Sequence, residues 1–165
     1  MDFGIIVSTG LFSNTGVYTM HVSEVLRKKG GLFTIKPDAT VGEAVRRLKY
    51  HKISALPVSE TEGSITGLIT ERDIMHAIAA HGPDALDMSI EQFMSQSVFY
   101  CAPEDTLKQI TQIMVLNHAR HLLVATDGKI VGIISKGDIL RNQLDESELE
   151  VNVMRDCVRL MSLRP

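Results

Sequence analysis

The feature that most constrains the fold of this chain is an internal repeat. Residues 37–60 match residues 103–126 at an offset of 66, and after one deleted residue the match resumes between residues 64–75 and residues 129–140. Self-similarity on this scale indicates two copies of one supersecondary unit. Each copy has only about 60 residues, which is near the lower limit for a domain that folds alone. We therefore expect the copies to pack against each other and to leave two related clefts between them.

The first copy has the hydrophobic pattern of a strand, a helix, a hairpin and a second helix. We predict a short strand at residues 32–35, and a helix from the apolar stripe at residues 41–48, which has helical spacing. Apolar runs at residues 55–58 and 65–69 flank a turn, as is typical of a β-hairpin. Thr70 then begins the second helix.

The second copy repeats this order. A strand is predicted at residues 98–101, a helix at 107–114, a hairpin from the runs at 122–124 and 130–134, and a last helix from Ser135. Each unit is therefore β-α-β-β-α. The predicted fold class is α/β (α+β), with two pseudo-symmetric repeats packed through their sheets.

Further segments flank the two copies. Short lead-in helices are predicted before each copy, with Ser23 and Ser89 as their N-caps. A terminal helix is expected either to cap the core of its own chain or to form a dimer contact, because its apolar residues fall along one side. The N-terminal residues, with a single charge among many Gly, Ser and Thr, are expected to be poorly ordered. The predicted division is an extension at 1–19, repeats at 20–82 and 83–146, and the terminal helix at 147–165.

Composition and charge exclude several classes of protein. Hydrophobic residues make up 44% of the chain and charged residues 22%, as in a globular protein. The net charge of −3 argues against a nucleic-acid binder, which would carry a basic field. No apolar run approaches the roughly 20 residues that a membrane-spanning helix needs. Cys101 and Cys157 lack metal-ligand spacing and are expected to be reduced thiols, which predicts a cytoplasmic protein.

Each copy ends in the pattern Gly-apolar-apolar-Ser/Thr-x-x-Asp, with Thr70 and Asp73 in the first and Ser135 and Asp138 in the second. The simpler interpretation is a capping box that only begins a helix. The alternative is a ligand site, because a strand glycine lets a ligand approach the backbone and a helix N-terminus favours an anion. An aspartate there could accept hydrogen bonds from a ribose diol. The residues alone lead no further than a small polar ligand, with or without phosphate.

These segments resemble a tandem pair of CBS (cystathionine β-synthase) domains, an arrangement called a Bateman module. The resemblance covers about residues 20–145. Within the family, the chain is similar to the short stand-alone CBS-pair proteins of bacteria. It is carried by ISALPV (53–58), GLITERDI (67–74), RHLLV (120–124) and GIISKGDI (132–139). In that family the ligand is usually AMP, ADP, ATP, S-adenosylmethionine or NAD(H), held in the clefts between the repeats.

The resemblance implies a set of binding residues. Ribose and phosphate would be met by Asp138, Ser135, Arg120, His121 and Lys136 at one site, and by Asp73, Thr70 and Arg72 at the other. Adenine would be lined by Ile53, Ser54, Ala55, Pro57, Ala119, Gly31 and Leu32. The first repeat has Ser54 and Ala55 where the second has Arg120 and His121. The Asp138 site is therefore expected to bind AMP about tenfold to a hundredfold more tightly than the Asp73 site.

No nucleophile–base pair, metal cluster or nucleotide-binding glycine motif is found in the sequence. We therefore expect a non-catalytic regulatory module, without catalytic residues, metal or catalytic cofactor. It would bind an adenine nucleotide, sense energy or redox state, form a homodimer and act on a protein partner in trans. Two alternatives remain open. One is a structural scaffold whose motifs are only caps, and the other is an enzyme that uses the paired aspartates to position a nucleotide for hydrolysis or transfer.

Overall fold

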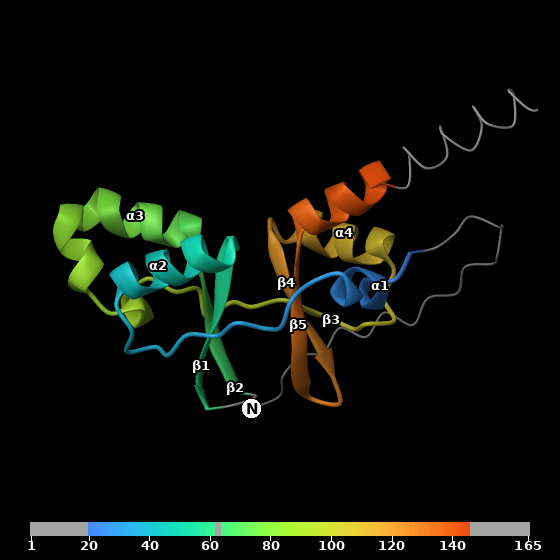
Figure 1. The fold of residues 1–165 in the computed structure, drawn as a ribbon, viewed down its shortest axis with the longest axis horizontal. Helices are drawn as coiled ribbons and strands as arrows, with labels where there is room; N and C mark the ends of the chain where they lie inside the picture. Colours follow the sequence, from blue (N-terminus) through green and yellow to red (C-terminus); the bar gives the residue numbers. More distant parts are fainter. Residues whose placement is uncertain (1–19, 62–63, 146–165) are drawn as a thin grey trace, which may run out of the picture.

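The computed structural model describes residues 20–61 and 64–145. The predicted extension at 1–19 and the predicted helix at 147–165 lie outside the described residues. Figure 1 shows two lobes of similar build, one for each repeat, with their hairpins side by side at the centre of the molecule. None of the helices in the described ranges is long and apolar enough to cross a lipid bilayer.

The elements follow the predicted order in both lobes, and the predicted α+β class is confirmed. Those up to the second repeat are α1 (Val22–Arg27), α2 (Val41–His51), β1 (Ala55–Thr61), β2 (Ser64–Thr70), α3 (Glu71–His81) and the 3-10 helices η1 (Gly82–Asp87) and η2 (Ile90–Gln92). The rest are β3 (Tyr100–Cys101), α4 (Leu107–Leu116), β4 (His121–Thr126) and β5 (Lys129–Ser135), followed by a helix over residues 136–145.

Threonine side chains begin α2 and α4 at equivalent positions of the repeat. The Oγ1 atom of Thr40 accepts a hydrogen bond from the backbone N–H of Glu43 at 3.1 Å, and that of Thr106 accepts one from Gln109 at 3.2 Å. Such caps satisfy backbone donors that have no partner inside the helix, and each contributes about 1 kcal/mol.

The lead-in helix α1 begins earlier than predicted, because its N-cap is His21 and not Ser23. The backbone N–H of His21 donates to Oε1 of Glu24 at 3.2 Å. Its ring Nδ1 donates to the carbonyl of Glu104 at 2.7 Å. The cap is made with the nearby Glu24, and the His21 ring is bonded to a residue far along the chain, which local sequence pattern does not reveal.

Two antiparallel hairpins form the centres of the lobes. β1 pairs with β2 so that Ala55 lies opposite Thr70, and β4 pairs with β5 so that His121 lies opposite Ser135. The second hairpin turns at residues 127–128, where φ is 50° and 74°. Positive φ at both central residues is what a two-residue type I′ turn requires. The equivalent registers place the two Ser/Thr-x-x-Asp motifs at matching points of their lobes.

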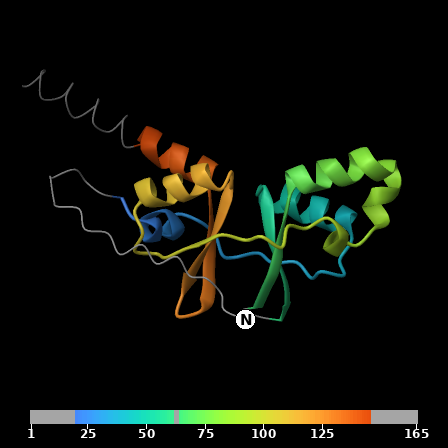
Figure 2. The same ribbon diagram turned by 180° about the vertical axis from the view of Figure 1, so that it is seen from behind.

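The predicted first strand of each repeat is shorter in the structure than the sequence pattern indicated. Of residues 98–101, only Tyr100–Cys101 forms a strand, parallel to β4. Of residues 32–35, only Ile35 pairs, in an isolated bridge to Val58. The chain before Ile35 is passing from one lobe to the other, so it has no neighbouring strand to extend the pairing (Figures 1 and 2).

Each lobe has its own apolar core, and α1 belongs to the core of the second lobe. Val22 and Val25 are buried with side chains of α4, β4 and β5, whereas Leu56 lies in a separate core of the first lobe. From α1 on the second lobe, the chain crosses to the first lobe over residues 28–34, the crossing segment, and it returns over residues 96–98 (Figure 2). The segment that leads into each repeat packs on the other one.

The strand glycines of the repeated motif make room for these lead-in segments. A Cβ atom on Gly132 would lie 2.7 Å from Cδ2 of Leu26, and one on Gly67 would lie 2.7 Å from Sδ of Met94. The approach of a ligand to the backbone at these glycines stays a prediction, and the space on the Cβ side of each is not where a ligand would lie. The space is already filled by a side chain from the segment that precedes the other repeat.

Candidate functional site

The candidate site is built at the junction between β5 and the helix over residues 136–145. The Oδ2 atom of Asp138 accepts hydrogen bonds from the backbone N–H of Ser135 at 2.8 Å and from its hydroxyl at 2.7 Å. Thr70 and Asp73 repeat this geometry at 2.8 and 2.6 Å. Both motifs are therefore capping boxes. Any further role of Asp138 falls to its second oxygen, Oδ1, which accepts no hydrogen bond from the described residues.

A lysine from the crossing segment completes the surroundings of this carboxylate. Lys29 Nζ donates to Oδ2 of Asp138 at 2.7 Å and to the carbonyl of Ile133 at 2.9 Å. The adjacent Lys28 donates to the side chain of Asn142 at 2.9 Å, and Asn142 in turn donates to the carbonyl of Asp138 at 2.8 Å. Two successive lysines thus attach the crossing segment to the helix that carries Asp138.

These contacts keep Asp138 ionised. Burial alone raises the pKa of the carboxyl, but hydrogen bonds from Lys29 and from the side chain and backbone of Ser135 outweigh it. The pKa therefore lies below its ordinary value of 3.8. Arg141 Nη2 is 3.6 Å from Oδ1, but its side chain is 76% exposed, so solvent screens that attraction. At neutral pH, Oδ1 is a charged acceptor.

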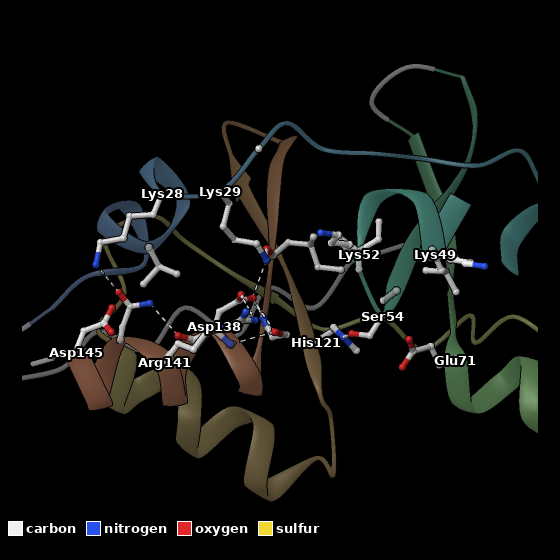
Figure 3. A pocket seen from close by; sticks show the side chains of 18 residues that line it. Lys28, Lys29, Lys49, Lys52, Ser54, Glu71, His121, Asp138, Arg141 and Asp145 are labelled. Carbon is white, nitrogen blue, oxygen red and sulfur yellow. Dashed lines mark hydrogen bonds and ion pairs between the residues drawn. The ribbon is translucent and has the colours of Figure 1, made fainter. Parts of the chain in front are cut away.

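A cavity of about 740 Å³ opens beside this carboxylate, between the two lobes (Figure 3). The second lobe and the crossing segment form one wall, and the end of α2 and the start of β1 form the other. Apolar side chains contribute from both sides, including Val25 and Ile133 on one wall and Leu48 and Ile53 on the other. The volume and this mixed lining are those of a small-molecule site.

The charged side chains that line the cavity are mostly cationic. The cations are Lys28, Lys29, Lys49, Lys52 and Arg141, and the carboxylates are Glu71, Asp138 and Asp145. Figure 3 shows that Lys29 reaches toward Asp138, while Lys49 and Lys52 belong to the opposite lobe. The cavity therefore favours an anionic ligand.

The two lobes contact each other at the cavity through Ser54 and His121, whose Oγ and Nε2 atoms are 2.9 Å apart (Figure 3). The pKa of His121 is lowered from 6.5 to about 4. Burial is the largest cause, the positive charge of Lys29 adds to it, and the carboxylates of Asp138 and Asp73 oppose it. A neutral imidazole can hydrogen-bond at pH 7, but it does not supply the phosphate charge that the resemblance implied.

The structure brings together part of the predicted site. The cavity is lined by Ile53, Ser54, Ala55, His121, Ser135 and Asp138. Its lining does not include Arg120, Lys136, Pro57, Ala119, Gly31 or Leu32, nor Thr70, Asp73 and Arg72 of the related motif.

Some of the residues outside the cavity have clear structural partners. The carbonyl of Arg120 accepts the backbone N–H of Lys136 at 3.0 Å, and the Arg120 side chain is exposed. Pro57 is buried in β1, where its carbonyl accepts the N–H of Ile35 at 3.0 Å. The positive charge at the cavity therefore comes from lysines of the crossing segment, from Lys49 and Lys52 at the end of α2, and from Arg141, and not from Arg120.

Sequence reasoning missed Lys29, the direct partner of Asp138. Its only signal was the run Arg27-Lys28-Lys29 ahead of two glycines. Helical periodicity places that run at the end of α1, but it does not reveal that α1 packs on the second lobe. The contact between Lys29 and Asp138 spans 109 positions of sequence.

Comparison with known proteins places the repeat in a family. The sequence model described as the CBS domain matches residues 22–80 and 90–145. The CBS domain-containing protein YhcV of Bacillus subtilis is 32% identical over 111 residues, which are 67% of this chain and 78% of YhcV.

Solved structures share the fold. The CBS-domain containing protein ATU1752 from Agrobacterium tumefaciens has a TM-score of 0.71 and 35% identity, covering 75% of this chain and 99% of that one. The CBS domain pair of protein MJ0100 has a TM-score of 0.66 and 25% identity, covering 74% of this chain and 98% of that one. Its crystal structure is a complex with 5′-methylthioadenosine and S-adenosyl-L-methionine.

Proposed function

Because this chain belongs to the CBS domain family, we propose that it is a non-catalytic regulatory module that binds an adenosine-containing nucleotide between its two repeats. The observation that carries the proposal is the ionised carboxylate of Asp138. The helix cap uses only its Oδ2 atom, so Oδ1 can accept hydrogen bonds from a ligand in the adjacent cavity of about 740 Å³. Such an oxygen can accept hydrogen bonds from the hydroxyls of a ribose. Both ligands of the MJ0100 complex contain adenosine, which supports this choice of ligand.

The proposed binding mode uses both walls of the cavity. Asp138 and Ser135 hold the ribose, and the adenine ring lies against Ile53 and Ala55 of the first lobe. The phosphate groups lie toward the cationic side chains. The motif with Asp73 is proposed as a second, weaker site of the same kind, with Thr70, Arg72 and Ala119 as its remaining members.

The proposed mechanism is a population shift. The two walls belong to different lobes, so a ligand that touches both favours one relative orientation of the lobes. The size of the shift is limited by the difference between the ligand's affinities for the two orientations. A protein partner that recognises that orientation would read the energy or redox state of the cytoplasm.

We also propose that two copies of the chain associate through their helices. Exposed apolar side chains gather on helices that lie on one side of the hairpins in Figure 1: Met75 and Ile78 on α3, Leu116 on α4, and Leu140 and Leu144 on the helix over residues 136–145. In a two-fold homodimer, an exposed apolar surface is buried against the same surface of the second copy. Light scattering should report a dimer for the wild type and a monomer for Met75→Lys/Leu140→Lys. Val131→Lys, on the exposed part of β5, should remain a dimer.

The function is tested by thermal unfolding and turnover of the purified protein. AMP, ATP or NADH should raise the midpoint of unfolding of the wild type, and Asp138→Ala should abolish the shift at the same ligand concentration. If no adenosine ligand shifts the midpoint, the motifs are only helix caps and the scaffold alternative holds.

The enzyme alternative makes a different prediction. Nucleotide hydrolysis or transfer by the wild type, lost in Asp138→Ala, would support it. Within the described ranges no group of three or more His, Cys, Asp or Glu could hold a metal ion. A hydrolytic mechanism would therefore have to activate water through the described side chains in another way or through residues outside them.

A further inference from the structure

Lys29 is bonded to one oxygen of the carboxylate whose other oxygen, Oδ1, the proposed ligand would use. Its ammonium is the third donor to Oδ2 of Asp138, after the backbone N–H and hydroxyl of Ser135. The same ammonium also donates a hydrogen bond to the backbone carbonyl of Ile133. Lys29 is 28% exposed and also lines the cavity, so one side of the ammonium faces the space beside Asp138.

The pseudo-symmetric carboxylate has no such lysine. Among the described residues, Asp73 receives hydrogen bonds only within its own capping box. The lead-in segments explain the difference, because Leu26 and Met94 occupy equivalent places against the strand glycines. The third residue after Leu26 is Lys29, whereas the third after Met94 is Ser97. The two motifs therefore share a backbone geometry but differ in the charge beside it.

We propose that Lys29 makes the Asp138 site selective for phosphorylated adenosine ligands over neutral nucleosides and over cationic ones such as S-adenosylmethionine. The inference rests on the proposed function, and it narrows the ligand class. Lys29, a residue of the crossing segment, would thus determine which ligand charge the site prefers.

The selectivity follows from the balance of charges at the carboxylate of Asp138. In the structure, the ammonium of Lys29 and the carboxylate of Asp138 neutralise each other at 2.7 Å. A ribose diol that hydrogen-bonds to Oδ1 draws on the same negative charge as the ammonium at Oδ2 and so weakens the ion pair, and a partly buried charge whose pairing is weakened is destabilising. A neutral nucleoside offers the ammonium no replacement. A phosphate group attached to the same ribose offers a charge-assisted hydrogen bond in exchange.

The opposite wall strengthens this preference. Lys49 and Lys52 line the cavity from the first lobe, and neither forms an ion pair with any of the described residues. An anion held by Lys29 would therefore be attracted by cations of both lobes. A cationic ligand would be repelled by the same charges.

Titration calorimetry with AMP and adenosine as probes tests the inference. The wild type should bind AMP more tightly than adenosine. In Lys29→Met, the affinity for AMP should fall by on the order of tenfold to a hundredfold, which is the range of one charge-assisted hydrogen bond. The affinity for adenosine should stay the same or rise, because the negative charge of Asp138 is then no longer shared with an ammonium. The preference for AMP should therefore shrink by at least the loss in AMP affinity.

Two variants serve as controls. Lys108→Met removes an exposed ammonium on α4, outside the lining of the cavity, and should keep the preference. Lys29→Arg keeps the positive charge and should therefore also keep the preference for AMP over adenosine. If Lys29→Met does not fold, Lys29→Gln carries the same prediction, because it retains a hydrogen-bond donor without the charge.

The possible results separate this inference from the proposed function. Equal loss of AMP and adenosine affinity in Lys29→Met would show that Lys29 only positions Asp138, and would overturn the inference alone. So would a wild type that binds both probes equally tightly. Absence of binding of either probe to the wild type would overturn the proposed function, and this inference with it.

Discussion

Replacing His121 by glutamine should make the fold less sensitive to acid. The pKa of His121 is about 4 in the folded protein, against 6.5 for an ordinary histidine. Between these two values the unfolded chain binds a proton that the folded chain does not. Stability therefore falls as the pH drops from about 6.5 toward 4. With these two pKa values, the linkage relation gives a loss of about 2 kcal/mol between pH 7 and pH 5.

The assay is urea unfolding at pH 7 and pH 5, followed by circular dichroism. His121→Gln keeps polar atoms near Ser54 but does not titrate, so its loss between the two pH values should be smaller than the wild-type loss by about 2 kcal/mol. His76→Gln, an exposed position on α3, should keep the wild-type loss. Asp138 does not interfere, because its lowered pKa stabilises the fold above about pH 3.8 and that contribution is lost only at lower pH. Equal losses in the wild type and His121→Gln would refute the reasoning.

Two further predictions concern packing and burial. Gly67→Ala should cost about 1–3 kcal/mol more than Gly132→Ala in urea unfolding, because its new Cβ would also lie 2.9 Å from the backbone carbonyl of Ser95, whereas Gly132 faces only a leucine side chain. Equal costs would contradict this packing. In a Cys157→Ser background, the thiol of Cys101 should react with a disulfide reagent at pH 8 only as fast as the protein opens, because burial and the charge of Asp105 raise its pKa to about 12. Rapid labelling of the native protein would show that the thiol is accessible.

Sequence pattern predicted the elements whose signals are local. The apolar stripes, the hairpins and the caps at Thr40, Thr70 and Ser135 depend on residues within a few positions of one another, and the structure has them where they were expected. The repeat itself located the equivalent residues Asp73 and Asp138, because aligning the copies needs no knowledge of packing.

Several departures from the predicted fold concern the segments that cross between the lobes. The position of α1, the cap at His21 and the shortened strand ending at Ile35 depend on which lobe a segment packs against, and local periodicity carries no such information. The resemblance implied Arg120 for the phosphate charge, and Arg120 is not part of the cavity lining. The cation bonded to Asp138 is instead Lys29, which belongs to the segment before the other repeat.

The most direct test of the central claim is titration calorimetry of AMP with the wild type, Asp138→Asn and Asp73→Asn. Asparagine keeps the size of the side chain and removes the charged acceptor from the ribose. The account predicts that Asp138→Asn loses most of the wild-type affinity and that Asp73→Asn loses much less. Unchanged affinity in Asp138→Asn would contradict the claim that this carboxylate holds the ligand between the lobes, and equal losses in both variants would contradict the difference between the two sites.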